Sequence, residues 1–192
     1  MHELILGGQK SGKSRRAESL AQQWLQQSPS HRALLLATAQ AHDAQMQQRI
    51  DRHRVQRQQS VPGLQTLEEP LALADAIARH SNPQTLLVVD CLTLWLTNWL
   101  MPAQPLGGDG EGDNAGAFAR QQQQLLDALA QARGEVVLVS NEIGWGVIPL
   151  GEAVRDFVDQ LGSLNQQIAQ ACSRVTLMAA GLPLVLKNES EY

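Results

Sequence analysis

Short apolar runs recur along the chain, and most of them are separated by longer stretches in which apolar residues follow a helical spacing. Six runs have the length and composition of buried strands, at residues 4–6, 34–37, 86–89, 136–139, 175–178 and 184–186. Strands that alternate with helices are typical of a mostly parallel sheet with helices on both faces. The pattern therefore predicts an α/β fold.

The end of the chain departs from this alternation. Only residues 179–183 separate the last two apolar runs, which is too short for the crossover between parallel strands, so an antiparallel hairpin is expected. No repeat or boundary divides the 192 residues, and one domain is expected. The stretch 101–117 is rich in Gly, Pro and acidic residues and is predicted to be a surface loop within that domain.

A core-facing helix is predicted between the fifth and sixth runs. Its apolar positions follow helical spacing, at Val154, Phe157, Val158, Leu161, Leu164, Ile168 and Ala171. The polar residues Arg155, Asp156 and Asn165 in the same stretch are expected at the surface.

The first apolar run stops at two glycines, and the segment Gly7-x-x-x-x-Gly12-Lys13-Ser14 follows. Apolar residues then recur at helical spacing, at Ala17, Leu20, Ala21, Trp24 and Leu25. A strand, this spacing and a helix together predict a phosphate-binding loop, in which Lys13 reaches the β- and γ-phosphates and the Ser14 hydroxyl binds magnesium. The ligand that this loop would bind is then a nucleoside triphosphate. The alternative is a glycine-rich turn that contains Gly-Lys-Ser by chance.

Ligands of open α/β sheets collect beyond the carboxyl ends of the strands. Asp90 directly follows the run 86–89, where a phosphate-loop protein places a second group directed at magnesium. A turn-forming or helix-capping role is the alternative.

Asn141 and Glu142 follow the run 136–139, and Trp145 lies between two glycines. There the tryptophan could stack on a flat ligand or simply be packed in an ordinary loop.

Basic residues gather in the segment after the second run. Met46 and Ile50 lead at helical spacing to His53, and Arg49, His53 and Arg57 form one stripe. Arg52 and Arg54 flank the histidine. Like charges at this spacing destabilise a helix unless an anion is near, and they disfavour imidazolium. A neutral His53 beside phosphate-binding arginines could attack a phosphorus atom. A solvated basic helix is the alternative.

Charge, apolar runs and cysteines limit the partners and the cellular location that we expect. The formal net charge is −4, which gives no electrostatic reason to expect nucleic acid. No apolar run approaches the length of a membrane span and no signal-peptide pattern occurs, so a soluble, cytoplasmic protein is expected. Cys91 and Cys172 are far apart in apolar runs, which predicts buried, reduced thiols rather than a disulfide or a zinc site.

Taken together, these segments resemble a known family almost from end to end. The matching elements are "GGQKSGKSRRAE", "AT" after the second run, "D…M..RI..HR..R", "TLEEP", "VVDCLTLWLTN", "NEIGWGVIP", "R.F.D..G..NQ..A" and "GLPLVLK". The chain is similar to the bifunctional adenosylcobinamide kinase/adenosylcobinamide-phosphate guanylyltransferases of cobalamin biosynthesis. It departs from them at Gln45, where Glu is common, and in residues 56–70, which are longer and lack a tryptophan.

The resemblance implies two reactions. ATP or GTP phosphorylates a hydroxyl of adenosylcobinamide, and GMP is then transferred from GTP to that phosphate through a guanylylated histidine, with release of pyrophosphate. It implies a RecA-like P-loop NTPase fold, Mg²⁺ at Ser14 and Asp90, a corrinoid small-molecule substrate and a homotrimer. The nucleophile falls on His53. The alternatives are a simple P-loop small-molecule kinase, in which His53 only clamps a phosphate, and a non-catalytic nucleotide-binding regulatory protein. The other implied nucleotide-site residues are Gly7, Gly8, Gln9, Lys10, Ser11, Gly12, Lys13, Ser14, Ala37, Thr38, Ala39, Arg54, Val55, Gln56, Arg57, Glu68 and Asp90.

Overall fold

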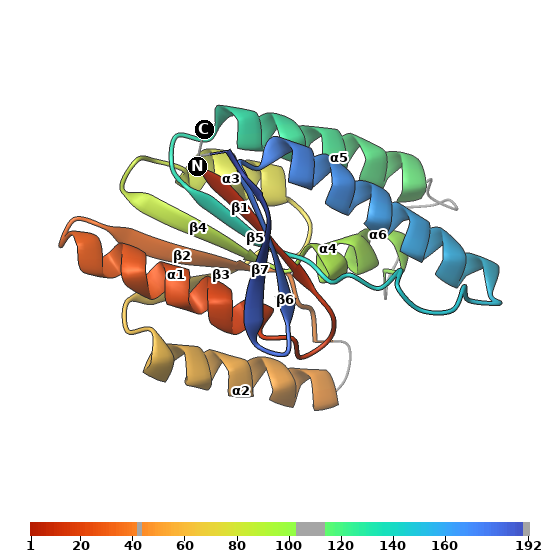
Figure 1. Cartoon of the computed structure of the whole chain (residues 1–192), viewed down its shortest axis with the longest axis horizontal. Coiled ribbons are helices and arrows are strands. Elements are labelled where there is room, and N and C mark those ends of the chain that lie inside the picture. Colours follow the sequence, from red (N-terminus) through yellow and green to blue (C-terminus); the bar gives the residue numbers. More distant parts are fainter. Residues whose placement is uncertain (42–43, 103–113, 190–192) are drawn as a thin grey trace.

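The computed structural model describes residues 1–41, 44–102 and 114–189, which form one layered α/β unit (Figure 1). The strands form a single sheet in the order β3-β2-β4-β5-β1-β6-β7. All neighbouring pairs are parallel except β6 and β7, which are antiparallel. This confirms the predicted mostly parallel sheet and C-terminal hairpin. The strands are β1 (His2–Gly7), β2 (Arg32–Ala37), β3 (Leu64–Glu68), β4 (Thr85–Asp90), β5 (Val136–Val139), β6 (Arg174–Ala179) and β7 (Leu182–Asn188).

Helices cover both faces of the sheet, as expected. The helices of the described residues are α1 (Lys13–Gln27), α2 (Ala44–Ser60), α3 (Leu73–His80), α4 (Leu92–Leu100), α5 (Asn114–Gln131) and α6 (Glu152–Ala171). One face packs on α1, and the other packs on α3, α4, α5 and α6. Helix α2 lies on the side of α1 (Figure 1), to which it is joined by a hydrogen bond from the Ser60 hydroxyl to Glu18.

Strand β1 shows why the core has two halves. Leu4 and Leu6 lie in the cluster that contains Trp95 and Ile168, whereas Ile5 lies in the cluster that contains Ala17 and Ala21. Successive side chains of a strand point to opposite faces, so a sheet covered on both sides is apolar at consecutive positions. The short continuous apolar runs of the sequence have this origin.

Four features differ from the sequence-based expectations. Strand β3 is not among the predicted strands, because only Leu64 of its five residues is fully buried at this edge of the sheet. Helix α5 begins at Asn114, so residues 114–117 are helical, while residues 103–113 lie outside the described part. In α6, Val154 and Ala171 are exposed, whereas Asn165 is buried.

The nitrogen of the buried Asn165 amide has a hydrogen-bond partner. Its Nδ2 donates to the carbonyl of Asn141 at 3.1 Å, which ties the middle of α6 to the residues after β5. A buried amide without such a bond would destabilise the fold. The surface position predicted for Asn165 is therefore wrong.

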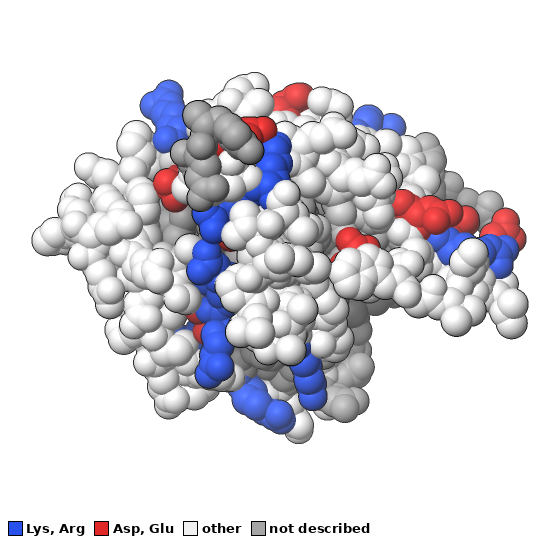
Figure 2. Space-filling model, in the orientation of Figure 1, with Lys and Arg blue, Asp and Glu red and all other residues white. Residues whose placement is uncertain are grey.

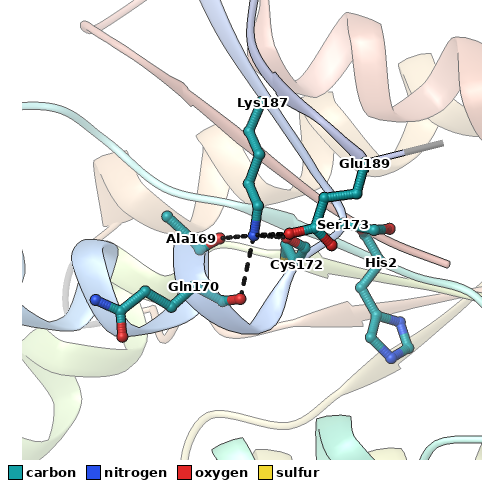
Figure 3. Close-up of polar contacts among 7 residues, drawn as sticks. All are labelled: His2, Ala169, Gln170, Cys172, Ser173, Lys187 and Glu189. Atoms are coloured by element: carbon teal, nitrogen blue, oxygen red, sulfur yellow. Dashed lines mark hydrogen bonds and ion pairs between the residues drawn. The ribbon is translucent and has the colours of Figure 1, made fainter. Parts of the chain in front are cut away.

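The C-terminal end of α6 is held by a lysine from β7 (Figure 3). Lys187 Nζ donates to the carbonyls of Ala169 and Gln170 at 3.2 Å and to that of Cys172 at 2.6 Å, and it lies 3.0 Å from a Glu189 carboxylate oxygen. The last carbonyls of a helix have no partner within the helix and carry a partial negative charge. One ammonium group thus joins the hairpin to α6.

Both cysteines are free and buried, as predicted. Burial raises the pKa of the Cys91 thiol to about 11 and that of Cys172 to about 12, so both remain protonated near neutral pH. Within the described residues, no helix combines the length and the apolar character needed to cross a membrane.

Candidate active site

A cavity of about 1260 Å³ lies at the carboxyl ends of the parallel strands. Its walls come from the loop after β1, the ends of β2, β3, β4 and β5, and one side of α2. Figure 2 shows a row of basic side chains that crosses this face of the molecule and reaches the region of α2. The lining residues include Lys13, Ser14, Ala37, Ala39, Met46, Ile50, Arg52, Arg54, Arg57, Glu68, Asp90 and Asn141. The sheet thus brings residues from the whole first three quarters of the chain to one place.

The loop between β1 and α1 has the backbone of a phosphate-binding loop. Gly7 and Gly12 have φ angles of 149° and 103°. A Cβ atom at Gly7 would lie 2.5 Å from the Met178 carbonyl oxygen, so that position requires glycine. Helix α1 begins directly after Gly12, at Lys13, so its free N–H groups face the cavity side of the loop.

Lys13, the first residue of α1, is buried against this loop. Its Nζ donates to the Gly8 carbonyl at 2.7 Å, so the side chain arches back over the loop. Burial lowers the pKa of the ammonium, while the Coulomb effects of Cys91 and Asp90 act in the opposite direction. An anion in the loop would therefore meet a partly desolvated ammonium, whose attraction is stronger than it would be in water.

Neighbouring elements support the loop from outside. The N–H of Gly181, in the turn of the β6–β7 hairpin, donates to the Ser11 carbonyl at 2.9 Å, and the N–H of Glu142 donates to the Gly7 carbonyl at 3.1 Å. A Cβ at Gly12 would lie 3.2 Å from the Gly181 Cα. The hairpin turn and the end of β5 thus enclose the loop.

Ser14 and Asp90 line the same cavity and offer a hydroxyl and a carboxylate oxygen. Among the described residues, no three His, Cys, Asp or Glu side chains cluster in a way that could hold a metal. Mg²⁺ is commonly held by one or two protein carboxylates together with substrate phosphates and water. The two oxygen donors fit that ion.

Ala37, at the end of β2, and the two residues after it differ in what they can contact. Ala37 and Ala39 line the cavity, whereas Thr38 does not and is fully buried. The Thr38 hydroxyl donates to the Cys91 carbonyl and accepts from the Cys91 N–H, both at 2.8 Å. Its side chain therefore joins the end of β2 to the end of β4.

Asn98 completes this connection and was not singled out in the sequence. Its Nδ2 donates to the Thr38 carbonyl at 2.8 Å and to the Pro70 carbonyl at 3.0 Å, from a buried position on α4. An amide inside an otherwise apolar helix face, as in Leu-Thr-Asn-Trp, is the signal that could have identified it.

Helix α2 presents the predicted basic side chains to the cavity. Arg52, Arg54 and Arg57 line it, and Arg54 lies 3.9 Å from a carboxylate oxygen of Glu68 at the end of β3. His53 belongs to α2 between two of these arginines, but its side chain lies outside the described part of the structure, as does that of Arg49.

Thr38 is not the only predicted residue outside the cavity wall, which also lacks Gly7, Gly8, Val55, Gln56 and Trp145. Val55 is exposed and does not line the cavity, and Gln56 borders a second, smaller hollow between α1 and α2. Trp145 has 75% of its surface exposed, so it is neither packed in a loop nor part of the cavity wall.

A glycine loop that ends in Lys13-Ser14, placed between a strand and a helix with Asp90 at the end of β4, defines a P-loop nucleotide-binding protein. A solved ATPase domain has the same fold, with a TM-score of 0.52 at 11% identity over 98% of this chain and 77% of that one. The model of the family described as "Cobinamide kinase / cobinamide phosphate guanyltransferase" matches residues 3–186. The chain belongs to this family.

Two relatives agree with this assignment. The chain is 46% identical over 189 residues to the "Bifunctional adenosylcobalamin biosynthesis protein CobP" of Pseudomonas aeruginosa, covering 98% of this chain and 99% of that protein. It is 34% identical to the "Bifunctional adenosylcobalamin biosynthesis protein CobU" of Escherichia coli, covering 96% and 98%. The protein is therefore an enzyme of cobalamin biosynthesis with kinase and guanylyltransferase activities.

Proposed function

We propose that the cavity beyond the parallel strands serves both reactions. In the first, a hydroxyl of adenosylcobinamide attacks the γ-phosphorus of ATP or GTP and the nucleoside diphosphate leaves. In the second, GTP supplies GMP to the resulting phosphate and pyrophosphate leaves. The observation that carries this proposal is that the arginines of α2 line the same cavity as the phosphate loop.

In the proposed site, residues 7–14 bind the triphosphate. The N–H groups of the loop and the Lys13 ammonium supply donors for the β- and γ-phosphates, and Lys13 would exchange the Gly8 carbonyl for phosphate oxygens. Ser14 and Asp90 would hold Mg²⁺, which offsets phosphate charge when bound. Ala37, Ala39, Arg54, Arg57 and Glu68 complete the wall around the nucleotide.

The second reaction needs a group directed at the α-phosphorus. We assign it to His53, because Arg52 and Arg54 on either side of it line the cavity. An imidazole nitrogen attacks the α-phosphorus, a P–N bond forms, and the bond to the pyrophosphate oxygen breaks. The corrinoid phosphate oxygen then attacks the same phosphorus, and the P–N bond breaks.

Labelling of the protein tests this assignment. With α-labelled GTP and Mg²⁺ but no corrinoid, we expect wild-type protein to retain label that acid removes and base does not, as for a phosphoramidate. His53→Asn should lose the label but still bind GTP and retain at least part of the kinase activity, because the substrate hydroxyl attacks the γ-phosphorus directly. Gln59→Asn, an exposed change in the same helix, serves as the control. Equal labelling of His53→Asn and wild type would remove His53 as the nucleophile.

The proposed assembly is a homotrimer in the cytoplasm, with a corrinoid as the small-molecule substrate. Its structural support is a set of apolar side chains between β5 and α6, where Val147 is 96% and Leu150 98% exposed. Several exposed large apolar side chains in one segment are typical of a protein–protein interface.

A further inference from the structure

A second hollow, of about 370 Å³, separates α1 from α2 beside the phosphate loop. Glu18 is the one acidic residue among those that line it, which are Ser14, Arg15, Glu18, Ser19, Gln22, Gln56, Ser60 and Val61. Glu18 follows Ser14 by four residues on α1, so the two side chains share one face of that helix. A carboxylate therefore lies between the phosphate-loop helix and the arginine-bearing helix.

Glu18 contacts the last turn of α2. The Ser60 hydroxyl donates to Glu18 Oε2 at 3.3 Å. Burial raises the pKa of the Glu18 carboxyl, the Ser60 bond and the charges of Arg57 and Arg15 lower it, and Asp90 raises it. The positive charge of Arg57, one turn before Ser60, thus acts on this carboxylate.

The charge of Arg57 would be stabilised by a nearby carboxylate. Within the described structure its Nε is buried and has no hydrogen-bond partner, while the residue lines the main cavity. Arg52 and Arg54 add positive charge to the same helix, which raises the cost of bringing α2 close to α1 unless a carboxylate faces it. Glu18 is placed to offset that repulsion.

The contact at Ser60 affects the position of residue 53, which lies nearer the N-terminal end of α2. Val61, directly after α2, is buried in the core, so the C-terminal end of the helix is the fixed end. Residue 53 lies seven residues before Ser60, or about 10 Å along a helix at 1.5 Å per residue. A tilt of about 15° at Ser60 would displace residue 53 by roughly 3 Å, whereas attack requires reacting atoms about 3–3.5 Å apart.

We propose that Glu18 is a positioning residue for guanylyl transfer: its carboxylate accepts the Ser60 hydrogen bond, attracts the charge of Arg57, and so holds the last turn of α2 against the phosphate-loop helix and sets the distance between residue 53 and the α-phosphorus. This rests on the proposed role of His53. The kinase step depends on it much less, because there the corrinoid hydroxyl attacks the γ-phosphorus directly and no group of α2 has to reach the reacting phosphorus.

The test compares the two half-reactions in Glu18→Ala and Glu18→Gln. For Glu18→Ala we expect the single-turnover rate of acid-labile labelling from α-labelled GTP to fall at least about tenfold, because small misplacements of reacting groups are costly. GTP affinity and kinase kcat should stay within about threefold of wild type. The labelling rate of Glu18→Gln should lie between those of wild type and Glu18→Ala, because glutamine can still accept the Ser60 hydrogen bond but does not attract Arg57.

Gln22→Ala is the matched control, because Gln22 lines the same hollow one turn further along α1. It should label at the wild-type rate. Equal losses in labelling and kinase activity for Glu18→Ala would show a general packing role and overturn the proposal, as would wild-type labelling by that variant. Absence of label on wild-type protein would instead overturn the role of His53 and the positioning role together.

Discussion

Lys13 shows at the scale of one residue how the fold prepares a charge for a ligand. The loop buries its ammonium, which lowers its pKa, and the Gly8 carbonyl accepts a hydrogen bond from it. An ammonium has three donors, so further acceptors can bind it without any rearrangement of the chain. Triphosphate oxygens are well suited to this role.

Replacement of this residue should affect both reactions. We expect Lys13→Ala to lower the kinase and guanylyltransferase rates by about 100-fold or more each, because one preorganised donor to developing charge typically contributes that much. Lys13→Arg should not rescue either, since a planar guanidinium does not fit a site built around an ammonium. Both rates would be measured on protein with an unchanged melting temperature. Wild-type turnover of both reactions in Lys13→Ala would place the triphosphate elsewhere.

The residues differ in how far the sequence could predict them. The loop at residues 7–14 was predictable because its geometry is local and its glycines are read directly from the chain. Asn98 and Asn165 were not, because their partners Thr38 and Asn141 are distant in the sequence and meet them only in the folded sheet. Thr38 was singled out, but its contact with Cys91 has the same long-range origin.

Among the elements, α6 and β7 depend on each other through Lys187. Three carbonyls at the end of the helix accept hydrogen bonds from its ammonium, and Glu189 adds an ion pair. The same hairpin donates from Gly181 to the phosphate loop. The C-terminal strands thus tie the far end of α6 and the loop around β1 into one unit.

Loss of that ammonium should destabilise the protein without altering its chemistry. We expect Lys187→Met to reduce the free energy of unfolding by about 2 kcal/mol, because hydrogen bonds to charged groups contribute roughly 1.5–3 kcal/mol and methionine keeps the apolar stem. For a chain of this size the melting temperature should drop by about 4–8 °C. Glu189→Gln removes only the exposed ion pair and should change stability by less than about 0.5 kcal/mol. Equal melting temperatures for Lys187→Met and wild type would contradict the capping role.

The elements that sequence could not place are those decided by their neighbours. Strand β3 has one fully buried residue and pairs only with β2, so its own pattern is too weak to show a strand. The apolar spacing of α6 continues to Val154, yet only Leu161, Leu164 and Ile168 of its apolar residues are buried, while Phe157 and Ala169 are partly buried against the same core. Periodicity indicates a helix but not how much of it the rest of the chain covers.

For the whole molecule, the informative feature is where apolar side chains remain exposed. One set lies between β5 and α6 and at the start of that helix, and includes Trp145, Val147, Ile148 and Leu150. A second set lies on the edge strand β7, with Leu182, Leu184, Val185 and Leu186. Figure 1 shows the two regions apart, with the segment before α6 extending away from the sheet. Two unlike surfaces on one chain suit a head-to-tail ring, in which each surface meets the other on the next copy.

The proposed trimer can be tested by a substitution in each of these two surfaces. We expect wild-type protein to have the mass of a trimer in light scattering coupled to size exclusion, and Leu150→Asp to shift it to monomer, because a buried unpaired charge destabilises an apolar interface. In a head-to-tail ring Leu184→Asp should have the same effect, although it lies on a different element. Gln166→Asp, an exposed change on α6, should remain trimeric. A monomeric wild type would overturn the trimer. A trimer that survives Leu150→Asp but not Leu184→Asp would place the contact on β7 alone and leave the surface before α6 for another partner.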